Sequence, residues 1–176
     1  MNSIRTASFI LGAAAAAFSI LAFGQQAGGL SEQDRDFMKN AIQGSYAEIE
    51  ASRLALQKDS SPDVRAFADT MIADHGSMAR EARTLAQEKG YMPPDGPSIA
   101  QKSEATALKA LSGGAFDAMY VNRIGVAAHE STIRQFEQAN QEVKDPDIKA
   151  MIEKTLPRLR EHLKMARALD AKQDAQ

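Results

Sequence analysis

Residues 61–75 read SPDVRAFADTMIADH, and this stretch decides how the chain folds. Ser61 is a favourable N-cap, Pro62 suits the first helical position, and Asp63 is stabilised by the positive end of a helix dipole. Apolar residues then recur at helical spacing, which predicts an amphipathic helix with one buried face. We expect this helix to end at Gly90, because glycine often follows a helix C-terminus.

The same kind of turn recurs at residues 145–148, which read DPDI, and each turn separates two long helical segments. Before the first turn, a capped amphipathic pattern predicts a helix over residues 31–58. Before the second turn, the pattern predicts a helix over residues 115–143. A last helix is expected over residues 146–170.

A proline-rich crossover joins the two hairpins. Residues 91–97 read YMPPDGP and cannot continue a helix, and a short helix is expected over residues 99–111. This order predicts an all-α, ferritin-like four-helix bundle over residues 31–170, built of two antiparallel hairpins with a long crossover that contains a short helix. Pro157 is expected to bend the last helix, and residues 171–176 are expected to form a disordered tail.

The beginning of the chain has the layout of a secretory signal peptide. Arg5 precedes an apolar run, and Ala22 and Gly24 supply the small residues of a cleavage site. We expect residues 1–24 to be removed and residues 25–30 to form the tail of an exported protein, periplasmic in a Gram-negative bacterium. After cleavage no stable membrane anchor remains. The alternative is an uncleaved anchor, because the run is nearly long enough to span a bilayer.

Composition excludes several kinds of function. The formal net charge of -2 gives no general attraction to nucleic acid, so no nucleic-acid partner is expected. The absence of cysteine excludes disulfides, thiolate catalysis and iron–sulfur ligation. No phosphate-binding loop, nucleotide fingerprint or serine elbow occurs, so no catalytic or organic-cofactor residues are predicted and a non-enzymatic protein is favoured. The oligomeric state is left open.

The three histidines, His75, His129 and His162, fall one on each of the last three long helices, each within an apolar stripe. A stripe position faces the interior of a helical bundle. On the first helix Glu48 occupies the corresponding place, and Gly44 is expected to permit close approach of a neighbouring helix.

These four residues are expected to lie at one depth. Glu48 and His75 lie 14 and 13 residues from Pro62, or about 20 Å along their helices. His129 and His162 lie 17 and 16 residues from Pro146, or about 25 Å. If the crossover spans the bundle, the two turns lie at opposite ends and both pairs meet near the middle of helices about 42 Å long. If the turns share one end, the two levels differ by only about 5 Å, so in either case one carboxylate and three imidazoles converge on one interior layer.

Such a layer predicts a metal site, because metal binding offsets the cost of burying polar groups. The predicted ligands are Glu48, His75, His129 and His162, with Asp74 and Glu161 as possible second-sphere acceptors. Imidazole and carboxylate together suit one transition-metal ion such as Zn, Fe or Cu. The alternative is a non-catalytic envelope or stress-related protein whose buried histidine–glutamate cluster is a structural hydrogen-bond network. The methionines are interpreted as core residues rather than copper ligands.

Several motifs together resemble a known family. They are Phe37 with Ala47-Glu48-Ile49, Ser61-Pro62-Asp63-Val64, Met71-Ile72-Ala73-Asp74-His75, Phe116-Asp117-Ala118-Met119-Tyr120, His129, and Leu156-Pro157 with Glu161-His162. The chain resembles the exported bacterial proteins of domain-of-unknown-function family 4142, and the resemblance implies an exported ferritin-like helical protein without supplying an activity. Ferritin-like di-iron enzymes carry Glu-x-x-His on two helices. Here Ile72 and Leu159 precede His75 and His162 by three residues, which argues against di-iron chemistry.

Overall fold

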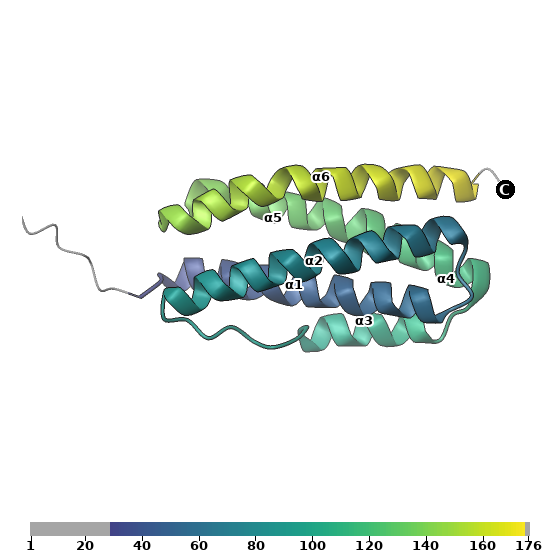
Figure 1. Ribbon diagram of the computed structural model, residues 1–176, viewed down its shortest axis with the longest axis horizontal. Coiled ribbons are helices and arrows are strands. Elements are labelled where there is room, and N and C mark those ends of the chain that lie inside the picture. Colours follow the sequence, from purple (N-terminus) through teal and green to yellow (C-terminus); the bar gives the residue numbers. More distant parts are fainter. Residues whose placement is uncertain (1–28, 175–176) are drawn as a thin grey trace, which may run out of the picture.

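The computed structural model describes residues 29–174, and within this range all regular secondary structure is helical. The long helical segments lie side by side along one axis (Figure 1). The all-helical prediction is therefore confirmed. Within the described range, no helix combines the length and the apolar character needed to cross a bilayer. The predicted signal peptide, residues 1–24, lies outside the described residues.

The first hairpin consists of α1 (Glu32–Gln57) and α2 (Pro62–Glu88). The Ser31 hydroxyl accepts a hydrogen bond from the Asp34 amide at 3.1 Å and caps α1. The Ser61 hydroxyl caps α2 in the same way, with the Val64 amide at 3.4 Å. The predicted caps and the predicted helix positions are confirmed, because local capping chemistry decides where these helices begin.

The crossover leaves α2 through Gly90, whose φ of 73° is accessible to glycine at little cost. It continues into α3 (Ile99–Lys109), which begins with a reciprocal capping box between Ser98 and Gln101. α3 packs against α1 and returns the chain toward the end of the molecule where α1 meets α2 (Figure 1). The two hairpin turns therefore lie at opposite ends of the molecule.

The third long segment is one continuous helical rod with three parts: α4 (Gly113–Met119), η1 (Tyr120–Ala128) and α5 (His129–Glu142). η1 is a π-helix, in which backbone hydrogen bonds reach five residues back instead of four. The apolar periodicity of these residues predicts a helix but not this change of winding.

The last helix, α6 (Pro146–Asp174), extends beyond residue 170, so residues 171–174 of the expected tail are helical. Asp145 caps its start, because one carboxylate oxygen accepts from the amides of Asp147 at 2.9 Å and Ile148 at 3.2 Å. α6 packs against α5 and η1, and it also contacts α2.

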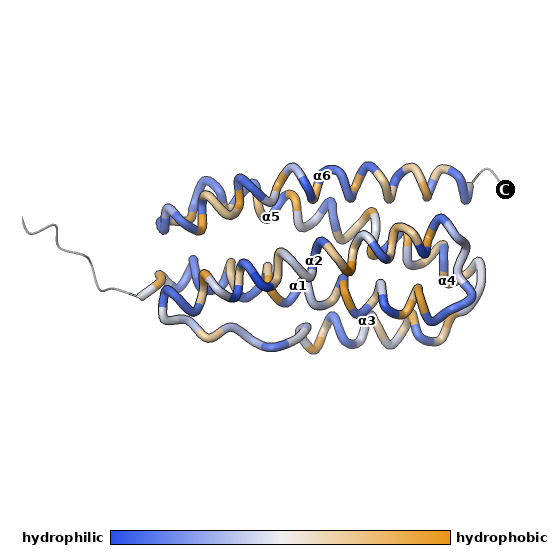
Figure 2. Tube along the Cα trace, in the orientation of Figure 1, coloured by the Kyte–Doolittle hydropathy of each residue, from blue (hydrophilic) through white to orange (hydrophobic). Residues whose placement is uncertain are grey.

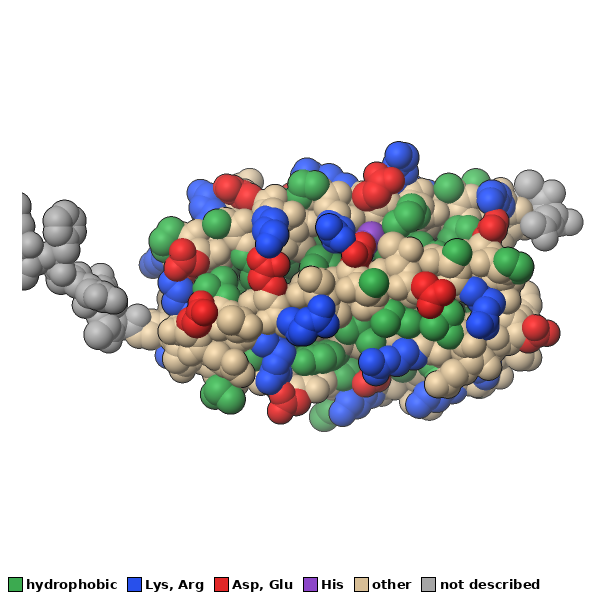
Figure 3. Space-filling view, in the orientation of Figure 1, with side chains coloured by type: hydrophobic (Ala, Val, Ile, Leu, Met, Phe, Trp, Pro, Cys, Tyr) green, Lys and Arg blue, Asp and Glu red, His purple; other side chains and the backbone are tan. Residues whose placement is uncertain are grey.

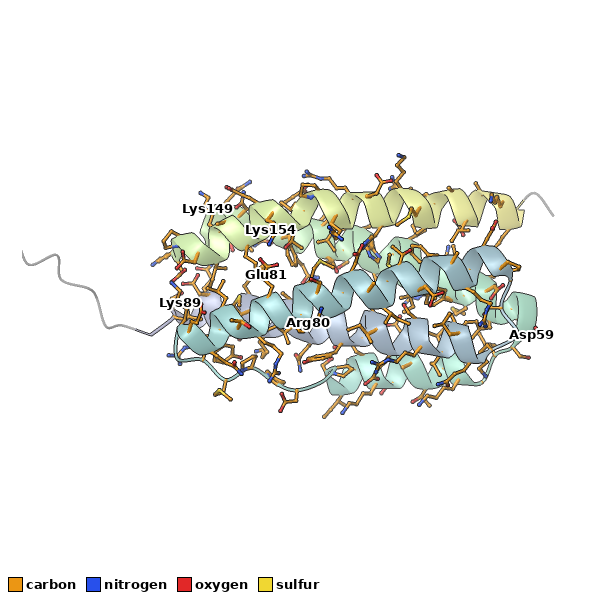
Figure 4. The ribbon with its side chains drawn as sticks, in the orientation of Figure 1. Asp59, Arg80, Glu81, Lys89, Lys149 and Lys154 are labelled. Carbon is orange, nitrogen blue, oxygen red and sulfur yellow. The ribbon has the colours of Figure 1, made fainter. Side chains whose placement is uncertain are left out.

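Charged side chains add a surface contact between the two hairpins. Lys154 of α6 donates to Glu81 of α2 at 2.5 Å, and Lys89 contacts Asp145 at 2.9 Å (Figure 4). Exposed pairs of this kind typically contribute about 0–1 kcal/mol, so apolar packing carries most of the stability. Acidic and basic side chains are interspersed over the face seen in Figure 3, which presents no large patch of one sign.

The apolar interior forms two clusters, one toward each end of the molecule. The first cluster includes Met38, Ile42, Phe136, Ile148 and Leu159. The second cluster includes Ala55, Phe67, Met71, Phe116, Tyr120 and Ala166. Figure 2 shows the alternation of apolar and polar residues along the helices that produces these buried faces. Buried polar residues separate the two clusters, and they form the site described below.

One close helix contact depends on glycine, and it lies at Gly125 rather than at Gly44. A Cβ atom at Gly125 would lie 2.8 Å from the Cβ of Ala166, so η1 and α6 approach closely there. A Cβ atom at Gly44 would meet nothing within 4 Å. The expectation that Gly44 permits close packing is therefore wrong.

We expect Gly125→Ala to destabilise the protein by about 1–3 kcal/mol, because the added methyl group overpacks a contact in which Ala166 has no flexible side chain to move away. Gly44→Ala is the matched control. It is expected to raise the free energy of unfolding by up to about 1 kcal/mol, because alanine favours the helix and space is available. Urea unfolding followed by circular dichroism measures both effects, and equal changes in the two variants would contradict the packing argument.

Candidate metal centre

Three buried imidazoles, on three helices, meet between the two apolar clusters. His75 belongs to α2, His129 is the first residue of α5, and His162 belongs to α6; their exposed fractions are 3%, 0% and 1%. The ring centroids form a nearly equilateral triangle with sides of 5.5, 5.2 and 5.4 Å. One nitrogen from each ring lies within 4.8 Å of the others. We call these three side chains the imidazole cluster.

The π-helix orients His129. Its Nδ1 lies 3.1 Å from the carbonyl oxygen of Ile124, five residues earlier in η1, and donates a hydrogen bond to it. That bond fixes the tautomer and leaves a lone pair on Nε2. Nε2 lies 3.4 Å from Nε2 of His75, so the free nitrogen of His129 points into the cluster.

Asp74 orients His162 from the neighbouring helix α2. Nε2 of His162 donates to one carboxylate oxygen of Asp74 at 2.8 Å, and Arg158 contacts the other oxygen. Nδ1 of His162 is buried and has no hydrogen-bond partner, and the same holds for Nδ1 of His75. His162 is therefore held through one nitrogen while its other nitrogen is free.

Glu48 is buried beside the imidazole cluster but is not a member of it. Its Oε1 lies 3.8 Å from Nδ1 of His129, the nitrogen that faces Ile124, and its Oε2 has no partner. The structure therefore brings together three of the four predicted ligands, and Glu48 approaches His129 from the side opposite the free nitrogen.

The backbone around Glu48 is held by two hydroxyl groups that are not among the predicted site residues. The Ser52 hydroxyl donates to the Glu48 carbonyl oxygen at 2.7 Å and lies 2.7 Å from the Tyr120 hydroxyl. Tyr120 begins η1, so this contact ties α1 to the π-helix that carries the backbone acceptor of His129. A serine inside a helical stripe is the only sequence signal for it.

Glu161 does not take part in the site, contrary to its suggested second-sphere role. Its side chain is 59% exposed and pairs with Lys164 at 3.5 Å. The reason is helical geometry, because adjacent residues point about 100° apart and His162 occupies the inward direction.

Burial controls the protonation of the cluster. Desolvation lowers the pKa of His75 well below its usual 6.5, and the other two imidazoles lower it further. Desolvation also lowers the pKa of His129 to about 4 and lowers that of His162, although Asp74 opposes the latter shift. At neutral pH the three imidazoles are therefore uncharged, which is the form that binds metal ions.

The pKa values of the two acidic residues, Glu48 and Asp74, are shifted in opposite directions. Burial, with a smaller contribution from Glu104, raises the pKa of Glu48 from 4.5 to about 8. Burial alone would also raise the pKa of Asp74, but hydrogen bonds from His162 and Arg158 outweigh it and lower the value. Asp74 is therefore ionised and able to hold the imidazole of His162.

The donor set fits a metal ion. Zn–N bonds of 2.0–2.1 Å in a tetrahedral site place the ligand nitrogens about 3.3–3.4 Å apart, and the His75–His129 pair already has a spacing of 3.4 Å. Histidine ligands normally donate their other ring nitrogen to a carbonyl or carboxylate, as His129 does to Ile124 and His162 to Asp74. Three protein nitrogens would leave a fourth position open.

Comparisons with known proteins support the family and the fold. A family model described as a domain of unknown function, DUF4142, matches residues 22–169. The fold is similar to the crystal structure of a DUF305 fragment from Deinococcus radiodurans, with a TM-score of 0.72, 12% identity, and coverage of 82% of this chain and 99% of that one. It is also similar to a conserved hypothetical protein, rv2844, from Mycobacterium tuberculosis, with a TM-score of 0.61, 12% identity, and coverage of 79% and 91%. No curated protein matches the chain.

Proposed function

Because the chain belongs to the DUF4142 family, whose description as a domain of unknown function names no activity, we propose a function from the geometry of the imidazole cluster: the protein binds one divalent transition-metal ion in its interior. The observation that carries this proposal is the convergence of His75, His129 and His162, whose ring nitrogens lie within 4.8 Å of one another in a buried layer.

A free, buried nitrogen in the imidazole cluster costs stability unless a ligand binds it. Burying a polar atom without a partner costs about 1–3 kcal/mol, and Nδ1 of His162 is buried without one. A metal ion coordinated by the cluster offsets that cost. Three apolar side chains would fill the same layer without burying an unpaired polar atom, so a purely structural role explains the three imidazoles less well.

The chemistry of the donor atoms limits which metal ions can bind. Neutral imidazole binds Zn, Cu, Fe and Ni, whereas Mg and Ca prefer oxygen ligands. In our proposal the hydrogen bond from Nδ1 of His129 to the carbonyl of Ile124 orients the ring and increases its basicity, while Oε1 of Glu48, 3.8 Å from the same nitrogen, lies beyond hydrogen-bond distance. If the side chain of Glu48 turns toward the cluster, it can instead bind the metal directly as a fourth ligand.

The proposal extends to location and architecture. Arg5, the following apolar run, and the small residues Ala22 and Gly24 support an exported protein with a cleaved signal peptide, periplasmic if the source is Gram-negative. The two antiparallel hairpins and their long crossover support classification as a ferritin-like four-helix bundle. In this compartment the protein would act as a metal-binding or metal-buffering protein.

The test is a metal titration of the full chain, expressed without an affinity tag and dialysed against a chelator. We expect Zn²⁺ to bind with a stoichiometry of about one per chain, since the cluster supplies a single set of three nitrogens. Competition between Zn²⁺, Cu²⁺ and Fe²⁺ then ranks the metals. The triple variant His75→Ala/His129→Ala/His162→Ala should lose this binding, while Glu161→Gln, beside the cluster but exposed, should keep it.

A structural network is the second candidate, and the hydrogen bond from His162 to the Asp74–Arg158 pair favours it. It predicts no stoichiometric metal. No zinc binding in the wild-type protein would overturn metal binding, and unchanged zinc binding in the triple variant would overturn the imidazole cluster as the metal site. Either result leaves the structural network as the role of the cluster.

A further inference from the structure

A cavity of about 230 Å³ opens between α1 and α5 and leads inward to Glu48 and His75. Its rim is formed by exposed polar residues, among them Asn40 of α1 and Gln135 of α5. Its walls are apolar and include Phe37, Phe136 and Met78. The cavity therefore has a polar entrance, an apolar middle and a polar inner end.

Small residues along one side of α1 create this space. Ala41 and Gly44 lie on the wall, and a Cβ atom at Gly44 would meet nothing within 4 Å. α1 packs mainly on α2, and α5 packs mainly on α6, so the seam between α1 and α5 is left open. A larger side chain at residue 44 would point into the cavity rather than into a neighbouring helix.

The inner end carries unpaired polar atoms. Oε2 of Glu48 and Nδ1 of His75 are both buried without a hydrogen-bond partner, and both residues line the cavity. Their side chains are more than nine-tenths buried, with exposed fractions of 7% and 3%. An occupant that reaches this end can therefore satisfy atoms that the protein leaves unsatisfied.

We propose that the cavity binds a small, uncharged and mainly apolar molecule that donates one hydrogen bond, from an O–H or N–H group, to the carboxyl group of Glu48. A carboxyl oxygen accepts such a bond whether or not the group is ionised. The lining includes acidic residues but no lysine or arginine, which disfavours an anionic occupant. An engineered apolar cavity of about 150 Å³ binds benzene, so this larger space suits a molecule the size of phenol or indole.

This inference does not depend on the metal. The occupant touches Glu48 and the cavity side of His75, whereas the proposed metal lies among the three imidazoles. Indole binding is therefore measured on two samples of the full chain, one dialysed against a chelator and one loaded with Zn²⁺. If the protein binds zinc but not indole, the cavity proposal alone is overturned. If it binds indole but not zinc, the metal proposal alone is overturned.

Indole is the probe, because it has an N–H donor and because the chain contains no tryptophan to obscure its fluorescence. We expect saturable binding of one indole per chain. Indene, which has the same shape but no N–H group, should compete about tenfold more weakly, the equivalent of one hydrogen bond. Equal affinity of indole and indene would overturn the role of Glu48.

Two variants test the location. Gly44→Leu should abolish saturable indole binding by filling the cavity, while Gly114→Leu, the same change at an exposed helical position with free space around it, should preserve binding. Glu48→Leu should weaken indole binding about tenfold and leave indene unchanged. Circular dichroism confirms that each variant is folded. Wild-type affinity in a folded Gly44→Leu protein, or absence of indole binding to the wild-type chain, would overturn the proposal.

Discussion

Replacing His129 with alanine is expected to lower the affinity for Zn²⁺ by a factor on the order of 100 or more, the largest effect of any single substitution. Loss of a group that merely orients a ligand costs about 10–100-fold, and loss of a ligand costs at least as much. His129 is the member whose free nitrogen is best defined, because its Nδ1 is held by Ile124 and its Nε2 lies 3.4 Å from His75.

The measurement is a competition titration with a chromophoric chelator on wild-type and variant protein. Glu130→Gln is the matched control, since Glu130 follows His129 on α5 but pairs at the surface with Arg167. The control is expected to bind zinc as the wild type does. If His129→Ala remains folded and keeps wild-type affinity, the imidazole cluster is not the metal site.

Glu48→Gln is expected to remove most of the pH dependence of stability between pH 7.5 and 8.5 in the metal-free protein. The pKa of Glu48 rises from 4.5 to about 8 on folding, so the folded chain holds a proton that the unfolded chain has released. The stabilisation is complete below pH 4.5 and is lost as the pH rises through 8. One such proton changes the free energy of unfolding by about 1.4 kcal/mol per pH unit.

The histidines act in the opposite sense and in a lower window. Their pKa values fall below 6.5 on folding, so their contribution to stability is present above pH 6.5 and is lost as the pH falls toward the folded value, about 4 for His129. Between pH 7.5 and 8.5 these three groups are neutral in the folded state and about nine-tenths or more neutral in the unfolded state, because the usual pKa of histidine is about 6.5. The slope in that window therefore belongs mainly to Glu48.

Denaturant unfolding of chelator-treated protein at several pH values between 7.5 and 8.5 measures this slope. Wild-type stability should fall as the pH rises, and Glu48→Gln should be nearly flat, because the amide does not titrate. Glu50→Gln, an exposed change on the same helix, should retain the wild-type slope. Parallel curves for wild type and Glu48→Gln would show that the buried carboxyl is not the titrating group.

Local sequence signals predicted the helix boundaries well. Ser31, Ser61 and Asp145 act as caps where their side chains can reach the first free amides, and this chemistry requires no knowledge of the rest of the fold. Helical periodicity likewise predicted which face of each helix is buried, and counting residues from the two turns predicted that the histidines share one layer.

The remaining features depend on tertiary packing. Nothing in residues 120–128 indicates a π-helix, because its cost is offset by contacts with α6 and α1 that a sequence does not reveal. Glu48 lies at the predicted depth, but its carboxyl group approaches Nδ1 of His129, on the side of the ring away from the cluster. Residue spacing predicts the depth of a side chain but not the direction in which its end group points within the layer. For Gly44, the same small residue suits either a close contact or an open cavity, and only the neighbouring helices decide which.

The π-helix also limits which changes of chain length this protein can accept. Each residue added to or removed from an α-helix turns everything beyond it by about 100°. Deleting one residue between Tyr120 and Ala128 would relax the segment toward ordinary winding, but it would also turn α4 relative to α5, so that Phe116 or His129 would leave the interior. Insertions and deletions in these nine residues should therefore be far less acceptable than substitutions. In the non-helical crossover at residues 91–98, by contrast, an insertion at exposed Met92 or Asp95, rather than at buried Pro93 or Pro97, turns no helix.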